Sequence, residues 1–132
     1  MNNQTKKKIL IVDDELNVCK SLRRALICPE YDIDMVLSGE EALQKEEEEK
    51  YDVVIADLMM PGINGLDLLQ SLKAKNALAK VIMITGYPTL KTTFQAMQIG
   101  AFDYLPKPFL PAELRALVAK ALTAAEEENS GT

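Results

Sequence analysis

Acidic residues follow two short apolar runs of the sequence, and a threonine and a lysine follow two other candidate strands. Asp13 and Asp14 come directly after the run 9–12, Asp57 ends "VVIAD", Thr85 ends "VIMIT", and Lys107 lies in "LPKPF". Carboxylates held close together raise one another's pKa unless a cation compensates their charge. Mg²⁺ is a natural compensator, because it prefers a few carboxylates, water and a substrate phosphate. The residue types therefore suit phosphoryl chemistry in which one aspartate is the nucleophile.

Each of these residues also has an ordinary structural explanation. The Asp13-Asp14 pair could cap a helix, since aspartate is a preferred N-cap. Asp57 could be a loop acid, Thr85 a β-branched strand residue and Lys107 a surface lysine. The joint pattern favours function, because the five residues fall at the ends of four separate predicted strands.

Three apolar runs rich in β-branched residues predict buried parallel strands at 9–12, 53–56 and 81–84. Weaker runs at 32–37 and 101–105 predict flanking or edge strands. Amphipathic helical patterns lie between the strands, and the last helix follows the fifth. The pattern-forming residues are Val18, Leu22 and Leu26; Leu66, Leu69 and Leu72; Leu90, Phe94 and Met97; and Leu114, Leu117, Val118, Ala121 and Leu122. A weakly amphipathic segment from Gly39 predicts the remaining helix.

Local signals mark some helix ends. Ser38 is a predicted N-cap, and Pro88 and Pro111 are expected near the first turns of the fourth and last helices. The acidic run 46–49 is interpreted as a solvated face. Five βα units predict a parallel α/β sheet with helices on both faces and a site at the carboxyl ends of its strands.

Length and composition bound the function. A chain of 132 residues suits one domain, expected at 1–126 with a frayed tail at 127–132. No apolar run is long enough for a membrane span or a signal peptide, so we expect a cytoplasmic protein. The net charge of −5 argues against direct nucleic-acid binding, and the basic cluster 6–8 is interpreted as a solubilising tail. The absence of histidine and of CxxC argues against a zinc site, and Cys19 and Cys28 are expected to be core thiols.

The motifs "ILIVDDE", "VVIADLMMPGINGLDLL", "VIMITGY" and "GAFDYLPKPF" occur in order and cover nearly the whole chain. In these motifs the chain resembles the receiver domains of bacterial two-component response regulators. The resemblance implies a flavodoxin-like fold of five βα units, a doubly wound parallel sheet with strand order 2-1-3-4-5. It implies a phosphoprotein of phosphorelay signal transduction, a phosphoacceptor rather than an enzyme.

The resemblance also implies roles for single residues. Asp57 would accept a phosphoryl group from a histidine kinase or phosphotransfer protein, and Thr85 and Lys107 would contact its oxygens. Asp13, Asp14 and Asp57 would bind Mg²⁺ together with the backbone carbonyl of Met59.

Two further implications concern the output of the domain. Tyr104 falls at the aromatic switch position, and Met59 and Tyr87 would flank the path of the attacking water. A partner or a second copy would dock on the fourth helix, fifth strand and last helix, around Lys91, Gln95, Gln98 and Tyr104.

Three other functions compete with this interpretation. An aspartate-nucleophile phosphatase of the haloacid dehalogenase class would carry its nucleophile on the first strand in a DxD pattern, but the first strand here ends in "DDEL". A flavodoxin-like cofactor binder would need a phosphate loop where this chain has two acids. A receiver-like interaction module working without phosphorylation would lose the acids or the lysine, and here all are kept. A side chain at Gly86, beside Thr85, is expected to obstruct the phosphoryl group.

Overall fold

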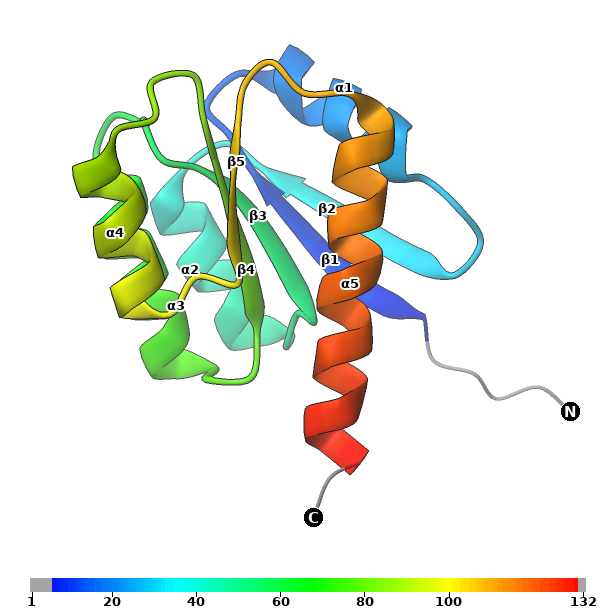
Figure 1. Ribbon diagram of the computed structural model, residues 1–132. Helices are drawn as coiled ribbons and strands as arrows, with labels where there is room; N and C mark the ends of the chain where they lie inside the picture. The colour runs from blue at the N-terminus through cyan, green and yellow to red at the C-terminus, as the bar shows by residue number, and fades with distance from the viewer. Residues whose placement is uncertain (1–5, 131–132) are drawn as a thin grey trace, which may run out of the picture.

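The computed structural model describes residues 6–130, and in this part of the chain five parallel strands form one sheet in the order β2-β1-β3-β4-β5 (Figure 1). The strands are β1 (Lys7–Val12), β2 (Tyr31–Val36), β3 (Val53–Asp57), β4 (Lys80–Thr85) and β5 (Asp103–Pro106). The helices are α1 (Leu16–Leu26), α2 (Gly39–Glu48), α3 (Gly65–Lys75), α4 (Leu90–Ile99) and α5 (Pro111–Ser130). The predicted fold class and strand order are confirmed.

The three central strands owe their position to their composition. Every residue of β3 and β4 is buried, as expected for apolar β-branched strands covered on both faces. Side chains alternate between the faces. Ile9, Ile55 and Ile82 point into one core, and Leu10 and Val54 point into the other.

The two cores lie under separate helical layers. Helices α1 and α5 cover one face of the sheet, and α2, α3 and α4 cover the other (Figure 1). Leu22 of α1 and Val118 of α5 pack in the first core, and Leu69 of α3 packs in the second. Burying one such side chain contributes about 1.5–3 kcal/mol. The helices therefore hold the strand ends, and the site on them, in fixed register.

The predicted helix ends are mostly confirmed. Ser38 caps α2, because its hydroxyl oxygen accepts a hydrogen bond from the Glu41 amide at 3.1 Å. Pro111 is the first residue of α5. Pro88, however, lies before the N-cap of α4, which is Thr89.

The acidic run and the basic cluster differ from their predictions. Glu46 is fully buried between α2 and α3, where its carboxylate accepts a hydrogen bond from the Asn76 side-chain amide at 3.0 Å. The interpretation of the whole run as a solvated face is therefore wrong at this residue. Likewise, Lys7 and Lys8 belong to β1, and Lys8 pairs with Asp32 at 3.1 Å.

Helix α4 meets the sheet in an unexpected way. The prediction of a helix from Leu90, Phe94 and Met97 is confirmed, but all three side chains are exposed, Leu90 at 91%. The fully buried residue of α4 is Ala96. Its small side chain packs against the core together with the partly buried Ile99, which leaves a stripe of large apolar side chains facing away.

Helix α5 extends beyond the expected domain end. Residues 127–130, predicted as part of a frayed tail, continue the helix, and residues 131–132 lie outside the described part. Glu128 forms an ion pair with Lys80, and Glu126 pairs with Lys7 at 3.3 Å. These lysines begin β4 and β1. Ion pairs thus connect the end of α5 to the amino ends of two strands of the sheet.

None of the helices in the described part of the chain combines the length and apolarity needed to cross a membrane.

Candidate functional site

Strand register places the predicted acids together. Val12 of β1 pairs with Ala56 of β3, so the residues that follow each, Asp13 and Asp57, lie side by side. One carboxylate oxygen from each of Asp13, Asp14 and Asp57 lies within 4.8 Å of the others. Asp13 and Asp57 are buried and Asp14 is exposed. The structure therefore brings all three sequence-predicted carboxylates into one cluster, open to solvent on the Asp14 side.

Asp13 is the most deeply buried member of the cluster. Its Oδ1 accepts a hydrogen bond from the Glu15 amide at 2.9 Å, whereas its buried Oδ2 has no hydrogen-bond partner. Burial, together with the charge of Asp57, raises the pKa of Asp13 to about 6, against the lowering effects of the Glu15 amide and Lys107. A buried carboxylate oxygen without a donor is a group that a cation would satisfy.

The capping explanation for the acid pair is not supported. The N-cap of α1 is Glu15, which makes no side-chain cap hydrogen bond. The Asp13 side chain bonds the cap residue itself rather than an amide inside the helix.

Lys107 supplies the positive charge of the site. Its amide donates to the Thr85 carbonyl oxygen at 2.7 Å, which fixes its backbone beside the end of β4. Its Nζ lies 3.8 Å from Asp13 Oδ2 and 3.7 Å from Asp57 Oδ2. One ammonium therefore bridges the two buried carboxylates, and it lies where it could also contact an anion bound beside Asp57.

Thr85 ends β4 with its side chain fully buried. Its hydroxyl oxygen accepts a hydrogen bond from the Tyr87 amide at 3.0 Å. Apart from the adjoining residues, a Cβ added to Gly86 would meet no atom of the described residues 6–130 within 4 Å, so the fold itself does not require glycine there. Any requirement would come from a bound group.

The loop after Asp57 is held tightly against the strand. The Met59 amide donates to Asp57 Oδ1 at 3.0 Å, and the Gly65 amide donates to the Leu58 carbonyl at 3.0 Å. A Cβ at Gly65 would lie 2.5 Å from Leu58 Cα. Glycine at the start of α3 is what lets the helix approach the backbone of the loop that follows Asp57.

Tyr104 lies apart from the acids, on β5. Its ring packs against the core under α4, and its hydroxyl lies 3.1 Å from Thr92 Oγ1 of that helix. Thr92 was not predicted to be functional. Its only sequence signal was its place three residues after Thr89, in a capping pattern that uses threonine instead of the usual glutamate or glutamine.

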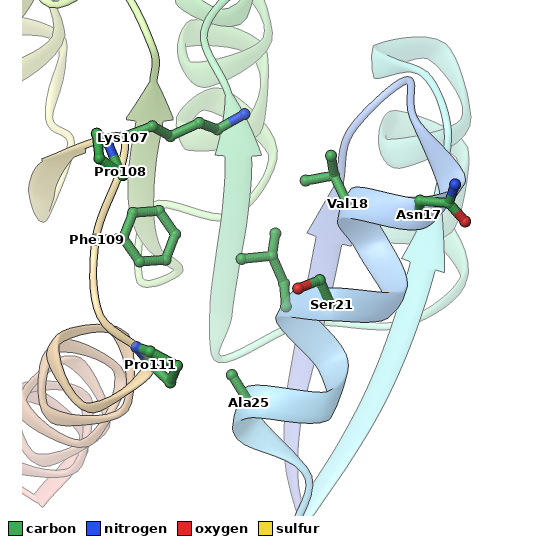
Figure 2. A pocket seen from close by; sticks show the side chains of 9 residues that line it. Asn17, Val18, Ser21, Ala25, Lys107, Pro108, Phe109 and Pro111 are labelled. Atoms are coloured by element: carbon green, nitrogen blue, oxygen red, sulfur yellow. The ribbon is translucent and has the colours of Figure 1, made fainter.

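A groove of about 450 Å³ adjoins the site between α1 and the segment that leads into α5. Figure 2 shows Phe109 and Pro111 on one side of the groove and Val18 and Ala25 on the other. The Lys107 side chain extends across the carboxyl end of the neighbouring strand (Figure 2), in agreement with its distance to Asp57.

Comparisons with known proteins agree with this geometry. Residues 9–119 match the response regulator receiver domain family. The chain is similar to the alkaline phosphatase synthesis transcriptional regulatory protein PhoP of Bacillus subtilis, with 35% identity over 91% of this chain and 50% of that protein. It is also similar to the DNA-binding transcriptional regulator NtrC of Klebsiella pneumoniae, with 38% identity over 89% of this chain and 25% of that protein.

A solved structure gives the same result. The CheY-like response regulator receiver domain protein from Methanospirillum hungatei superposes with a TM-score of 0.90 at 30% identity, covering 94% of this chain and 99% of that one. The chain belongs to the response regulator receiver domain family of two-component systems. It spans about half the length of PhoP and about a quarter of NtrC.

Proposed function

We propose that this receiver domain accepts a phosphoryl group on Asp57 from a histidine kinase or phosphotransfer protein, and that it controls a downstream output by a change of conformation. The observation that carries the proposal is the position of Asp57 at the end of a buried strand, with Lys107 Nζ 3.7 Å from its carboxylate. A carboxylate on a rigid element is a positioned nucleophile.

The proposed transfer is a substitution at phosphorus. A carboxylate oxygen of Asp57 forms the new O–P bond, the N–P bond of the donor phosphohistidine breaks, and the electron pair leaves with the imidazole nitrogen. Phosphoryl transfer needs positioning and charge stabilisation more than further covalent chemistry. Lys107 would neutralise charge on the phosphoryl oxygens, and the Thr85 hydroxyl would donate a hydrogen bond to one of them.

The donor set fits Mg²⁺. Asp13, Asp14 and Asp57 offer oxygen ligands, and Asp13 Oδ2 is buried without a partner. We propose that these residues hold the ion together with the Met59 carbonyl; the Met59 amide hydrogen bond to Asp57 keeps this residue next to the acceptor. Bound there, Mg²⁺ would supply positive charge to the phosphoryl oxygens. The protein residues bind and orient the reacting groups.

The test is incubation with acetyl phosphate and Mg²⁺ followed by intact-mass measurement. We expect wild type to gain one phosphoryl group and Asp57→Asn to gain none. Asp14→Ala should raise the Mg²⁺ concentration needed for phosphorylation, because it removes one proposed ligand. Absence of the adduct in wild type would contradict the proposal and favour an interaction module that works without phosphorylation. Release of inorganic phosphate from many small phosphoesters would instead favour a phosphatase.

The exposed apolar side chains of α4 suggest a docking surface through which the domain would control its output. Leu90, Phe94 and Met97 form an exposed apolar stripe on α4. Of the other residues predicted for docking, Gln95 and Gln98 line a hollow between α4 and α3. We propose that a partner or second copy docks on α4, β5 and α5. Phe94→Ser should weaken any phosphodonor-dependent self-association in sedimentation velocity without changing the intact-mass result. Association that is unchanged in this variant would place the interface elsewhere.

A further inference from the structure

The hydroxyl of Thr92 lies at the contact between helix α4 and strand β5. Thr92 lies in the first turn of α4, and Tyr104 lies on the neighbouring strand β5. The Thr92 Oγ1 atom is 3.1 Å from the Tyr104 hydroxyl and 2.9 Å from the hydroxyl of Thr89, the N-cap of α4. The same oxygen therefore contacts both the helix cap and the aromatic side chain of the strand.

The Thr92 hydroxyl has more polar neighbours than it can bond at one time. A threonine hydroxyl has one hydrogen and two acceptor lone pairs. Its neighbours are the Thr89 carbonyl oxygen at 3.2 Å, the Thr89 amide at 3.4 Å, the Thr89 hydroxyl at 2.9 Å and the Tyr104 hydroxyl at 3.1 Å. The carbonyl can only accept and the amide can only donate, whereas each of the two hydroxyls can do both. The phenol of Tyr104 therefore shares the hydrogen-bonding capacity of Thr92 with the cap, and its contact tethers the first turn of α4 to β5.

One hydrogen bond and a short stretch of chain connect this turn with the site around Asp57. The Thr85 hydroxyl holds the Tyr87 amide at 3.0 Å, and Tyr87 is two residues before the cap Thr89. If the Thr85 hydroxyl turns to a phosphoryl group on Asp57, the Tyr87 amide loses its acceptor. The cap of α4 is then the next hydrogen-bonded unit along the chain, and Thr92 passes its displacement to Tyr104.

We propose that Thr92 is a positioning residue whose hydroxyl couples the orientation of Tyr104 to the N-terminal cap of α4. Its use as a switch rests on the proposed phosphorylation of Asp57. The coupling itself exists in the unphosphorylated protein and is measured there.

The amide of Thr93 provides a direct readout of the coupling. This amide donates to the Thr89 carbonyl at 3.0 Å, in the first turn of α4, so its hydrogen-exchange protection measures how often the first turn opens. Tyr104→Phe removes only the phenol oxygen, on a different element. We expect this variant to lower the protection of Thr93 about two- to tenfold, the range that one net hydrogen bond gives.

A double-mutant cycle separates coupling from simple capping. Thr92→Val removes the tether together with the hydrogen bond from the Thr89 amide, whereas the cap bond from the Thr92 amide to the Thr89 hydroxyl stays. Tyr104→Phe should therefore cause no further loss in the Thr92→Val background. Thr92→Ser keeps the hydroxyl and should retain wild-type protection and the wild-type response to Tyr104→Phe. Equal effects of Tyr104→Phe in the wild-type and Thr92→Val backgrounds, or a serine variant that behaves like valine, would overturn the proposal.

The role in switching is measured with acetyl phosphate and Mg²⁺ on the same variants, with intact mass recorded in parallel. We expect Thr92→Val to reach wild-type phosphorylation at Asp57 but to lose the correlated amide-shift changes of Thr93 and Tyr104. A phosphorylated Thr92→Val protein with the full wild-type response would overturn the switching role. A wild-type protein that gains no phosphoryl group would instead overturn the proposed function, while the exchange cycle would still decide the coupling.

Discussion

Asp13→Asn should stabilise the metal-free protein, although Asp13 is a proposed Mg²⁺ ligand. The side chain is fully buried, its Oδ2 has no hydrogen-bond partner, and Asp57 lies beside it. Asparagine is nearly isosteric and its oxygen can keep the hydrogen bond from the Glu15 amide. The substitution therefore removes a buried charge that is unfavourable beside Asp57, and it retains the local structure.

The magnitude follows from the pKa. Burial and the charge of Asp57 raise the pKa of Asp13 from 3.8 to about 6, and each pH unit corresponds to about 1.4 kcal/mol. The folded protein binds more protons than the unfolded chain between these two values, so stability falls as pH rises through this window and stays low above it. At pH 7 the ionised side chain costs on the order of 3 kcal/mol, as an upper limit.

Urea unfolding at pH 7 in EDTA, followed by circular dichroism, measures this effect. With a urea m-value of about 1–3 kcal/mol/M, the midpoint of Asp13→Asn should lie above that of wild type by up to roughly 1–3 M. Asp14→Asn is the matched control, because Asp14 is exposed and should change the midpoint little. Saturating Mg²⁺ should narrow the difference by stabilising wild type. An Asp13→Asn midpoint at or below that of wild type, or an equal gain in Asp14→Asn, would refute the argument.

Three further predictions concern packing, proton binding and phosphate lifetime. Gly65→Ala should destabilise the fold by about 1–3 kcal/mol in urea unfolding, because its Cβ would lie 2.7 Å from the Leu58 carbonyl oxygen. Gly86→Ala is the control: its Cβ would meet no described atom within 4 Å apart from the adjoining residues, so its free energy of unfolding should stay within about 0.5 kcal/mol of wild type. Equal losses of stability in the two variants would contradict this. Burial raises the pKa of Glu46 above 4.5, so the free energy of unfolding of wild type should fall as pH rises above that value. Glu46→Gln should show a weaker fall. A pH profile of stability that is the same in Glu46→Gln and wild type would rule this out. Met59 is a poor hydrogen-bond partner for water, so a phosphoryl group on Asp57 should be long-lived. Met59→Asn should change the rate of dephosphorylation measured by intact mass. Identical decay curves for Met59→Asn and wild type would disprove the role of this residue.

The sequence predicted the sheet and the acid cluster for the same reason. Three β-branched runs could only be central strands, and parallel strands bring their carboxyl ends to one edge. Asp13 and Asp57 therefore had to be neighbours once Val12 and Ala56 were paired. The clustering of the carboxylates at this edge could be predicted before any contact was known.

The misinterpreted residues depend on packing between helices. Glu46 lies within four consecutive glutamates, so only the approach of α3, with Asn76 as a hydrogen-bond donor, distinguishes it from its exposed neighbours Glu47 and Glu48. On α4, Leu90 and Phe94 form an apolar pattern like that of a core face, but the small Ala96 makes the core contact. Periodicity predicts a helix and its apolar stripe, but it does not determine whether that stripe faces the core.

The ion pairs at the end of α5 hold that end of the helix far from Asp57. This helix starts just after Lys107, at the end of the sheet that carries Asp57, and its 20 residues span about 30 Å. It ends where Glu128 meets Lys80 at the amino ends of the strands (Figure 1). Asp57 and the far end of the helix thus lie at opposite poles of the domain. A change at Asp57 would reach residues that leave the domain at this far end through α5 or through the side faces of the domain.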